Sequence, residues 1–175
     1  MTPHAWQRTT LVQHSHCSYC GTRYTEELAW PRTCAGCGET TWHNPLPVAM
    51  VLVPVVTGSG TGLVVIRRAT EPARGELALP GGFIETGETW QEAAVRELGE
   101  ETGIPARAET VRLFDVVSAR ATINIFALLP ARPATELPPS APTAEATEWL
   151  VITAPRALAF PTATAAVEQY FAATG

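Results

Sequence analysis

The chain lacks three features that would assign it to a membrane, a secretory route or nucleic acid. It has no run of about 18 uninterrupted apolar residues, so no transmembrane helix is expected. Its first residues have no apolar centre of the kind found in secretory signals, which predicts a cytoplasmic location. Basic residues are outnumbered, with 12 Lys and Arg against 17 Asp and Glu. Because nucleic-acid binders usually carry a basic excess, no nucleic-acid partner is expected, and a phosphate-bearing substrate would need metal ions.

Length and composition indicate one main domain with a small accessory module. A chain of 175 residues with 46% hydrophobic residues can bury one good core. Residues 1–16 are polar and without periodicity, and we expect a loosely ordered lead there. All four cysteines fall within 17–43, which we take as a separate module. The main domain is then expected over 44–175.

The main domain is expected to combine strands with two helices. Apolar and β-branched runs predict strands over 48–56, 63–68, 111–117, 122–129 and 148–152. Helical periodicity is found over 89–102 and 163–173. Thr86 or Thr89 is placed to cap the first helix, and Gly103 is placed to end it. Strands before and after a central helix predict an α/β fold with a mixed sheet covered by helices.

Three glutamates of the first expected helix can share one face. Glu97, Glu100 and Glu101 stand at i, i+3 and i+4, so a helix brings their carboxylates close together. Such crowding favours a bound cation, and Mg²⁺ or Mn²⁺ prefers oxygen ligands. A solvated acidic face is the alternative for the helix taken alone. The glycine-rich loop over 81–88 favours the metal site, because glycine lets backbone groups approach a metal or a phosphate.

The loop and helix together resemble a known signature. Gly82 is followed after five residues by Glu88, and after seven more by Arg96-Glu97-Leu98-Gly99-Glu100-Glu101-Thr102-Gly103-Ile104. This pattern resembles the complete Nudix box, glycine-x5-glutamate-x7-Arg-Glu-apolar-x-Glu-Glu-x-Gly-apolar. The segments from Arg67 to Gly82 and over 158–161 also fit relatives, so the likeness extends over about residues 45–172.

Resemblance to the Nudix hydrolase family implies both a fold and a reaction. The fold would be an α/β/α sandwich with a mixed sheet. Glu97, Glu100 and Glu101 would hold Mg²⁺ or Mn²⁺, assisted by a backbone carbonyl near Gly82. The reaction would be hydrolysis of the pyrophosphate linkage in a nucleoside diphosphate derivative, by attack of an activated water on phosphorus.

The same resemblance implies roles for residues around the triad. Arg96 and Glu88 would pair with each other and fix the loop. Family members often use a glutamate on a later loop as general base. By position Glu145 is the first candidate and Glu148 the second, although both are also ordinary surface acids.

Basic and aromatic side chains near the box are candidates for substrate contacts. Arg67 and Arg68, with Arg74 beside them, can pair with a diphosphate. Aromatic rings that can stack on a base or a flavin, or simply fill the core, are Phe83, Phe126, Trp149 and Phe160. We predict Arg67, Arg68 and Phe83 as the substrate-binding residues. Leu77 stands where many relatives have tryptophan, so a stacking contact is not expected there.

The cysteines form two C-x-x-C pairs with thirteen residues between them. Each pair is followed by glycine, a pattern that favours a structural Cys₄ zinc site in a ribbon over a redox pair or free thiols. The predicted ligands are Cys17, Cys20, Cys34 and Cys37. With four sulfurs available, the neighbouring imidazoles are expected to be surface residues: His14, His16 and His43. A structural or dimerising role is expected for the ribbon, and a homodimer stays open.

A ribbon before a Nudix domain is similar to two subgroups, the NADH pyrophosphatases and the ADP-ribose/FAD pyrophosphatases. The first typically carries Ser-Gln-Pro-Trp-Pro-Phe-Pro after its box, and this segment is absent here. Residues 123–126 and 156–163 look more like the second. ADP-ribose or FAD is therefore the expected small-molecule substrate, with NADH or NAD as the alternative. The intact triad disfavours a non-catalytic nucleotide sensor, and the acidic charge disfavours an RNA 5′-end pyrophosphohydrolase.

Overall fold

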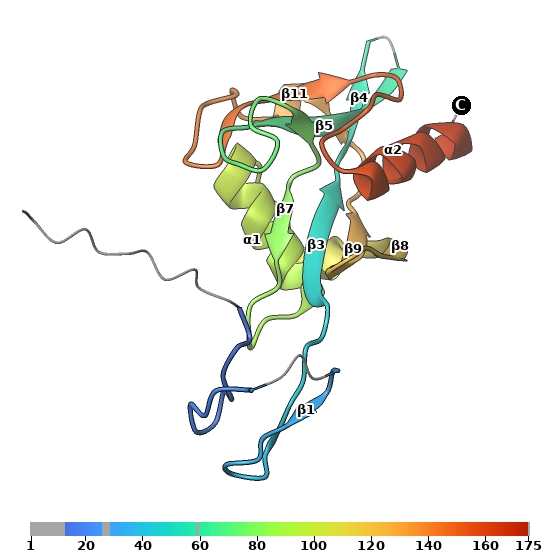
Figure 1. Ribbon diagram of the computed structural model, residues 1–175. Helices are drawn as coiled ribbons and strands as arrows, with labels where there is room; N and C mark the ends of the chain where they lie inside the picture. The colour runs from blue at the N-terminus through green and yellow to red at the C-terminus, as the bar shows by residue number, and fades with distance from the viewer. Residues whose placement is uncertain (1–12, 26–28, 59, 175) are drawn as a thin grey trace, which may run out of the picture. The chain divides into compact units, whose positions relative to one another are not determined.

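The computed structural model describes residues 13–25, 29–58 and 60–174 (Figure 1). Most of the expected N-terminal lead therefore lies outside the described residues. The chain divides into two compact units, Met1–Asn44 and Pro45–Gly175. In the first unit, β1 (Arg32–Thr33) pairs antiparallel with β2 (Thr40–Thr41). The two cysteine pairs flank β1 in this small unit.

The second unit holds two sheets, each with parallel and antiparallel neighbours. Its strands are β3 (Leu46–Leu52), β4 (Pro54–Thr57), β5 (Gly60–Arg68), β6 (Leu77–Ala78), β7 (Gly81–Phe83), β8 (Arg112–Ser118), β9 (Thr122–Leu128), β10 (Arg132–Pro133) and β11 (Ala146–Ile152). One sheet has the order β7-β3-β9-β8, in which β3 and β9 are parallel. The other has the order β10-β4-β5-β11, with β6 also paired to β5. In the first sheet β7 is an edge strand.

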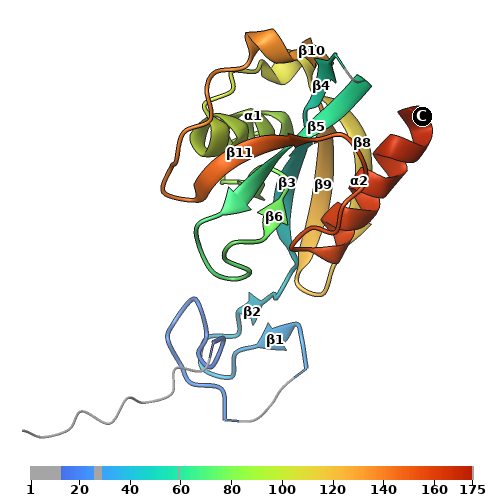
Figure 2. The ribbon, with the colours of Figure 1, turned by 90° about the horizontal axis from the view of Figure 1, so that it is seen from above.

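Two helices lie on opposite sides of the strands, as Figure 2 shows. They are α1 (Trp90–Thr102) and α2 (Pro161–Thr174), and short 3₁₀ turns occur at Ala108–Thr110 and Ala134–Glu136. Along β5, Val64 packs into the core under α1, whereas Leu63 and Val65 pack into the core under α2. This alternation is the period of two that a strand buried on both faces requires. The predicted mixed-sheet α/β/α sandwich is confirmed.

One strand prediction is wrong. The apolar run over 48–56 does not form a single strand, because Val53 separates β3 from β4 and the two belong to different sheets. Pro54 begins β4, a position where the missing backbone N–H of proline costs no ladder hydrogen bond. Since Leu52 and Val53 are both fully buried, the apolar pattern alone carries no sign of this break.

The ends of α1 are fixed by local hydrogen bonds. The Thr89 hydroxyl accepts from the backbone N–H of Glu92, and the Glu92 carboxylate accepts from the N–H of Thr89. This capping box selects Thr89 over Thr86 as the N-cap. Gly103 ends the helix with a φ of 70°. None of the described helices is long and apolar enough to cross a bilayer.

Candidate metal and substrate site

Two of the three predicted glutamates point from α1 into the protein. Glu97 is 8% exposed and Glu101 is 2% exposed, whereas Glu100 lies on the outer side of the helix. The backbone N–H of Gly81 donates to the Glu101 carboxylate over 2.8 Å. Both buried carboxylates therefore face the backbone of β7.

The two glycines of β7 make this close approach possible. A Cβ added to Gly82 would overlap the Glu97 carboxylate. Gly81 has a φ of 151°, and a Cβ there would overlap the carbonyl oxygen of Ala49 on β3. Gly82 thus leaves no side chain between β7 and the Glu97 carboxylate, and Gly81 lets β7 lie close to β3.

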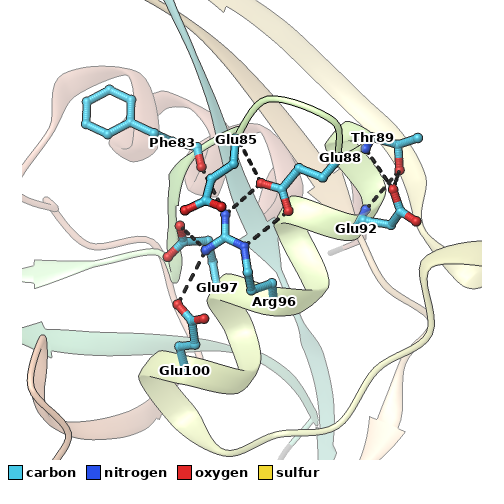
Figure 3. Close-up of polar contacts among 8 residues, drawn as sticks. All are labelled: Phe83, Glu85, Glu88, Thr89, Glu92, Arg96, Glu97 and Glu100. Carbon is cyan, nitrogen blue, oxygen red and sulfur yellow. Dashed lines mark hydrogen bonds and ion pairs between the residues drawn. The ribbon is translucent and has the colours of Figure 1, made fainter.

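The Arg96 guanidinium lies at the centre of the outer acidic groups (Figure 3). It binds both carboxylate oxygens of Glu88, at 3.1 and 2.7 Å, so the implied pair is present. It also donates to the carbonyl oxygen of Phe83 at 3.0 Å. Its Nη1 contacts Glu97 at 2.8 Å and Glu100 at 3.3 Å. Arg96 thus ties the loop after β7 to the acidic face, and its hydrogen bonds lower the pKa of Glu88.

The inner carboxylates have the opposite electrostatic character. Burial raises the pKa of Glu101 from the ordinary 4.5 to about 8, and the charges of Glu97 and Glu145 add to this effect. The Gly81 hydrogen bond opposes the rise. Burial also raises the pKa of Glu97, against the stabilising contact with Arg96. Two buried acids with too little positive charge around them are a good fit for a hard divalent cation.

The carboxylates of Glu97, Glu100 and Glu101 do not form a tight cluster. Among the described residues, only the cysteines form a group of three or more His, Cys, Asp or Glu with all ligand atoms within 4.8 Å of one another. Arg96 bonds to Glu97 and Glu100 at the same time. It therefore already neutralises part of the negative charge that a bound metal ion would neutralise. The candidate metal ligands on this face are all carboxylate or carbonyl oxygens, the ligand type that Mg²⁺ and Mn²⁺ prefer.

A cleft of about 940 Å³ opens along this face within the second unit. Most of the residues predicted for the site line it: Arg68, Gly82, Phe83, Glu97, Glu100 and Glu145. Glu101 lies behind them, on Gly81. Phe160 also lines the cleft, and its ring lies 5.2 Å from the Arg68 guanidinium carbon.

Several sequence candidates lie elsewhere. Arg67 forms an ion pair with Glu148 at 2.7 Å across β5 and β11, and neither residue lines the cleft. Phe126 is fully buried in the core under α2, so the structure does not support base stacking by this ring. Trp149 packs against the core under α1. Cross-strand pairing and burial decide these positions, and neither is visible in local spacing.

Sequence reasoning missed the polar side of the cleft. Thr122 and Asn124 of β9 and Thr162 of α2 line it, and Asn124 is only 3% exposed. The available signal was a lone asparagine within the apolar run of β9. A buried amide must find hydrogen-bond partners, which are often functional groups.

The first unit brings the four cysteine sulfurs together. The Sγ atoms of Cys17 and Cys37 are 3.8 Å apart, and those of Cys20 and Cys34 are 3.7 Å apart. A tetrahedral zinc ion with Zn–S bonds of about 2.3 Å needs sulfur separations of about 3.8 Å. Backbone N–H groups of Tyr19 and Gly36 donate to Cys17 and Cys34. All four are free thiols, and the geometry fits zinc.

The histidines near the cysteines are not part of this cluster. His14 is half-buried, with its ring 5.4 Å from that of Trp30 and 4.3 Å from that of His43. The surface position expected for His14 is therefore only partly right. His16 and His43 are exposed, as expected.

Residues 46–170 match the NUDIX domain. The chain belongs to the NUDIX family. Among solved structures it is similar to a NUDIX hydrolase from Nitrosomonas europaea, with 22% identity, a TM-score of 0.68 and 90% of each chain covered. It is also similar to a bifunctional NMN adenylyltransferase/ADP ribose pyrophosphatase from Francisella tularensis, complexed with AMP and a manganese ion. That likeness has 28% identity and a TM-score of 0.53, over 63% of this chain and 34% of the other.

Two curated relatives match parts of this NUDIX chain. An ADP-ribose pyrophosphatase of Methanocaldococcus jannaschii is 47% identical over 49 residues, which is 28% of this chain and 29% of the relative. An NAD-capped RNA hydrolase NudC of Escherichia coli is 28% identical over 95 residues, 54% of this chain and 35% of the relative. The chain thus spans about a third of the length of these relatives.

The raised pKa of Glu101 predicts how the stability of this NUDIX protein depends on pH. Between pH 4.5 and about 8 the folded state keeps a proton that the unfolded state releases, so stability falls as pH rises through this window. In magnesium-free buffer, urea unfolding should show a loss of roughly 2–4 kcal/mol for this group. Glu101→Gln should remove most of that slope, and the exposed Glu100→Gln should keep it. An unchanged slope in Glu101→Gln would contradict the assignment.

Proposed function

We propose that this NUDIX protein hydrolyses the pyrophosphate linkage of a nucleoside diphosphate derivative, with ADP-ribose or FAD as the first candidates. Glu97, Glu100 and Glu101 hold Mg²⁺ or Mn²⁺, with a backbone carbonyl near Gly82. The observation that carries the proposal is the pair of buried carboxylates set against the side-chain-free backbone of β7, beside a cleft. This arrangement concentrates carboxylate oxygens whose mutual repulsion is relieved by a bound cation or, in its absence, by a proton on Glu101.

The names of relatives support the choice of substrate. The Methanocaldococcus jannaschii relative and the Francisella tularensis structure are both named ADP-ribose pyrophosphatases. The NudC relative is named an NAD-capped RNA hydrolase, which makes NAD derivatives the second candidate. All of these names describe a diphosphate attached to a nucleoside.

We assign different roles to the proposed metal ion and to the arginines of the cleft. A bound Mg²⁺ or Mn²⁺ supplies charge neutralisation on phosphate oxygens and a lowered pKa for water. Arg68 and Arg96 are cations that line the cleft and can contact a diphosphate. The Arg96 contacts also hold the loop in place. Arg67, paired with Glu148 outside the cleft, is not included in our proposed contact set.

Glu145 is the proposed general base. It lines the same cleft as Glu97 and Glu100, and its charge contributes to the raised pKa values of both Glu97 and Glu101. Its own carbonyl oxygen accepts from the N–H of Ala69 at 2.7 Å, which anchors the loop before β11 to the end of β5. Glu145 would take a proton from the attacking water as the bond between phosphorus and the bridging oxygen breaks.

Removing a metal-binding carboxylate should abolish most of the activity. Glu97→Gln is expected to lower kcat/KM for ADP-ribose by about two orders of magnitude or more, because it removes several kcal/mol of charge stabilisation. Glu92→Gln is the matched control: it lies on the same helix, loses the same charge and keeps a side chain that completes the capping box. AMP release with Mg²⁺ or Mn²⁺ measures both.

The same assay with a substrate panel tests the reaction class. ADP-ribose, FAD, NADH and 5′-triphosphate RNA are offered to the parent protein. Turnover of ADP-ribose or FAD above the others supports the proposal, and preferential turnover of NADH supports the second candidate. Hydrolysis of no member would support the alternative of a non-catalytic nucleotide sensor. Equal activity of Glu97→Gln and the parent would rule out the metal site.

The assignment of Glu145 as base makes a separate prediction. Glu145→Gln should lower kcat by about 10²–10⁴-fold, the range for loss of a positioned base, while Mg²⁺ affinity changes little. Glu148→Gln removes a carboxylate three residues away that is bound to Arg67, and it should keep near-parent kcat. A Glu145→Gln protein with normal turnover would show that another group takes the proton.

For the first unit we propose a structural Cys₄ zinc site. Among its described residues, only Cys17 and Cys34 are buried, so thiols take the place of an apolar core. Backbone hydrogen bonds from Cys20 and Tyr19 lower the pKa of Cys17 to about 6, whereas burial and the neighbouring thiols raise the pKa of Cys37, so full ionisation of the four thiols needs a cation among them.

Zinc content should depend on the cysteines alone. Elemental analysis is expected to find about one equivalent of zinc per chain, and less than about half in Cys34→Ser. The exposed neighbour His16 serves as the control, and His16→Ala should keep full occupancy. Less than half an equivalent in the parent, or full zinc in Cys34→Ser, would count against the ribbon site.

A further inference from the structure

The cleft has a second end on the other face of β7, where the hydroxyl and amide groups of Thr122, Asn124 and Thr162 line it. Gly82 faces Glu97 and α1, so its neighbour Phe83 must point to the opposite face of the sheet. The register places Phe83 opposite Val48 on β3, and Val48 opposite Asn124 on β9. All three line the cleft. Figure 3 shows the Phe83 ring turned away from Arg96, which its carbonyl oxygen faces.

The polar groups at this end form one directed chain. The Thr122 hydroxyl donates to Oδ1 of Asn124 over 2.9 Å. Nδ2 of Asn124 donates to the Thr162 hydroxyl over 2.9 Å. Thr122 is therefore left with free lone pairs as an acceptor, and Thr162 is left with a free O–H as a donor. Asn124 therefore determines that the Thr122 hydroxyl is available as an acceptor and the Thr162 hydroxyl as a donor.

The dimensions of the cleft suit a nucleotide lying across β7. Two strand spacings, about 9–10 Å, separate β7 from β9, so a diphosphate near Gly82 and a base near Asn124 can be held at once. The Phe83 ring, in a residue that is 56% exposed, offers an apolar surface beside the second position. β7 is the edge strand of its sheet, and at Gly82 it carries no side chain between the two ends of the cleft.

We infer that this second end holds the adenine base, with Thr122 accepting from its exocyclic amino group and Thr162 donating to a ring nitrogen. The inference rests on the proposed hydrolysis of an adenine nucleotide and names the subsite that recognises it. Asn124 acts as a positioning residue, because it sets the direction of both hydrogen bonds. Hypoxanthine carries an oxo group and a ring N–H at the same edge, so its donor and acceptor are reversed.

Discrimination between adenine and hypoxanthine tests this subsite. The parent should prefer ADP-ribose to inosine diphosphate ribose by about tenfold in kcat/KM, and AMP to IMP by a similar ratio in Kd, because mismatched polar groups stay unpaired. Thr162→Val keeps the shape of the side chain and removes the donor. It should bring both ratios close to one, mainly by weakening the adenine compound.

Asn124→Asp provides an independent variant. A carboxylate accepts from both hydroxyls, so Thr162 loses its free O–H and the ratios should again fall toward one. A purely structural defect would weaken the adenine and hypoxanthine compounds equally and leave the ratios unchanged. Thr174→Val is the matched control, since its hydroxyl bonds only to the Tyr170 carbonyl in the same helix.

The two proposals fail in different ways. Equal kcat/KM and equal Kd for the adenine and hypoxanthine compounds in the parent would overturn the subsite, even if hydrolysis is fast. Unchanged ratios in Thr162→Val would overturn it as well. Preference for AMP without hydrolysis of ADP-ribose would support the subsite and reject the proposed function.

Discussion

The contact between α1 and β7 is the constraint on which the site depends. Two buried carboxylates lie against this strand: Gly82 leaves no side chain in front of Glu97, and the backbone N–H of Gly81 donates to Glu101. This contact requires α1 to start and end at fixed residues, which the capping box at Thr89 and the left-handed Gly103 provide. It also requires a sheet that is buried on both faces, so that α1 and α2 pack on opposite sides without competing for the same strands. The chemistry therefore follows from packing at one edge strand.

Arg96 gives the acidic face a resident positive charge. By bonding to Glu88, Glu97 and Glu100 together, it compensates part of their charge, whereas the Glu101 carboxylate accepts from the backbone N–H of Gly81. The contrast appears in the acid strengths, since the pKa of Glu88 is lowered and that of Glu101 is raised. The carboxylates bonded to Arg96 are thus partly compensated, whereas Glu101 is buried with little compensating charge, and the proposed divalent ion would relieve the most repulsion there.

The parts of the protein that the sequence predicts are those governed by local spacing. Residues of α1 are related by helical periodicity and the cysteine pairs by tight turns, so their proximity can be derived without knowing the fold. Pairings between distant segments were not accessible in this way. Arg67 meets Glu148 only because β5 and β11 are neighbours, and Asn124 meets Thr162 only because the start of α2 lies beside β9. The break between β3 and β4 at Val53 could not be predicted from the sequence, because the run of buried apolar residues continues across it.

The two units differ in what their interiors are made of. The second unit folds around aliphatic side chains on both faces of its sheets, whereas the described interior of the first consists of two thiols. Heat and urea unfold the second unit by exposing its aliphatic core to water. Chelators that remove the proposed zinc, and oxidants that attack its thiolate ligands, should dismantle the first unit while the core of the second stays packed. The same polypeptide would then respond to two unrelated kinds of stress, one at each end.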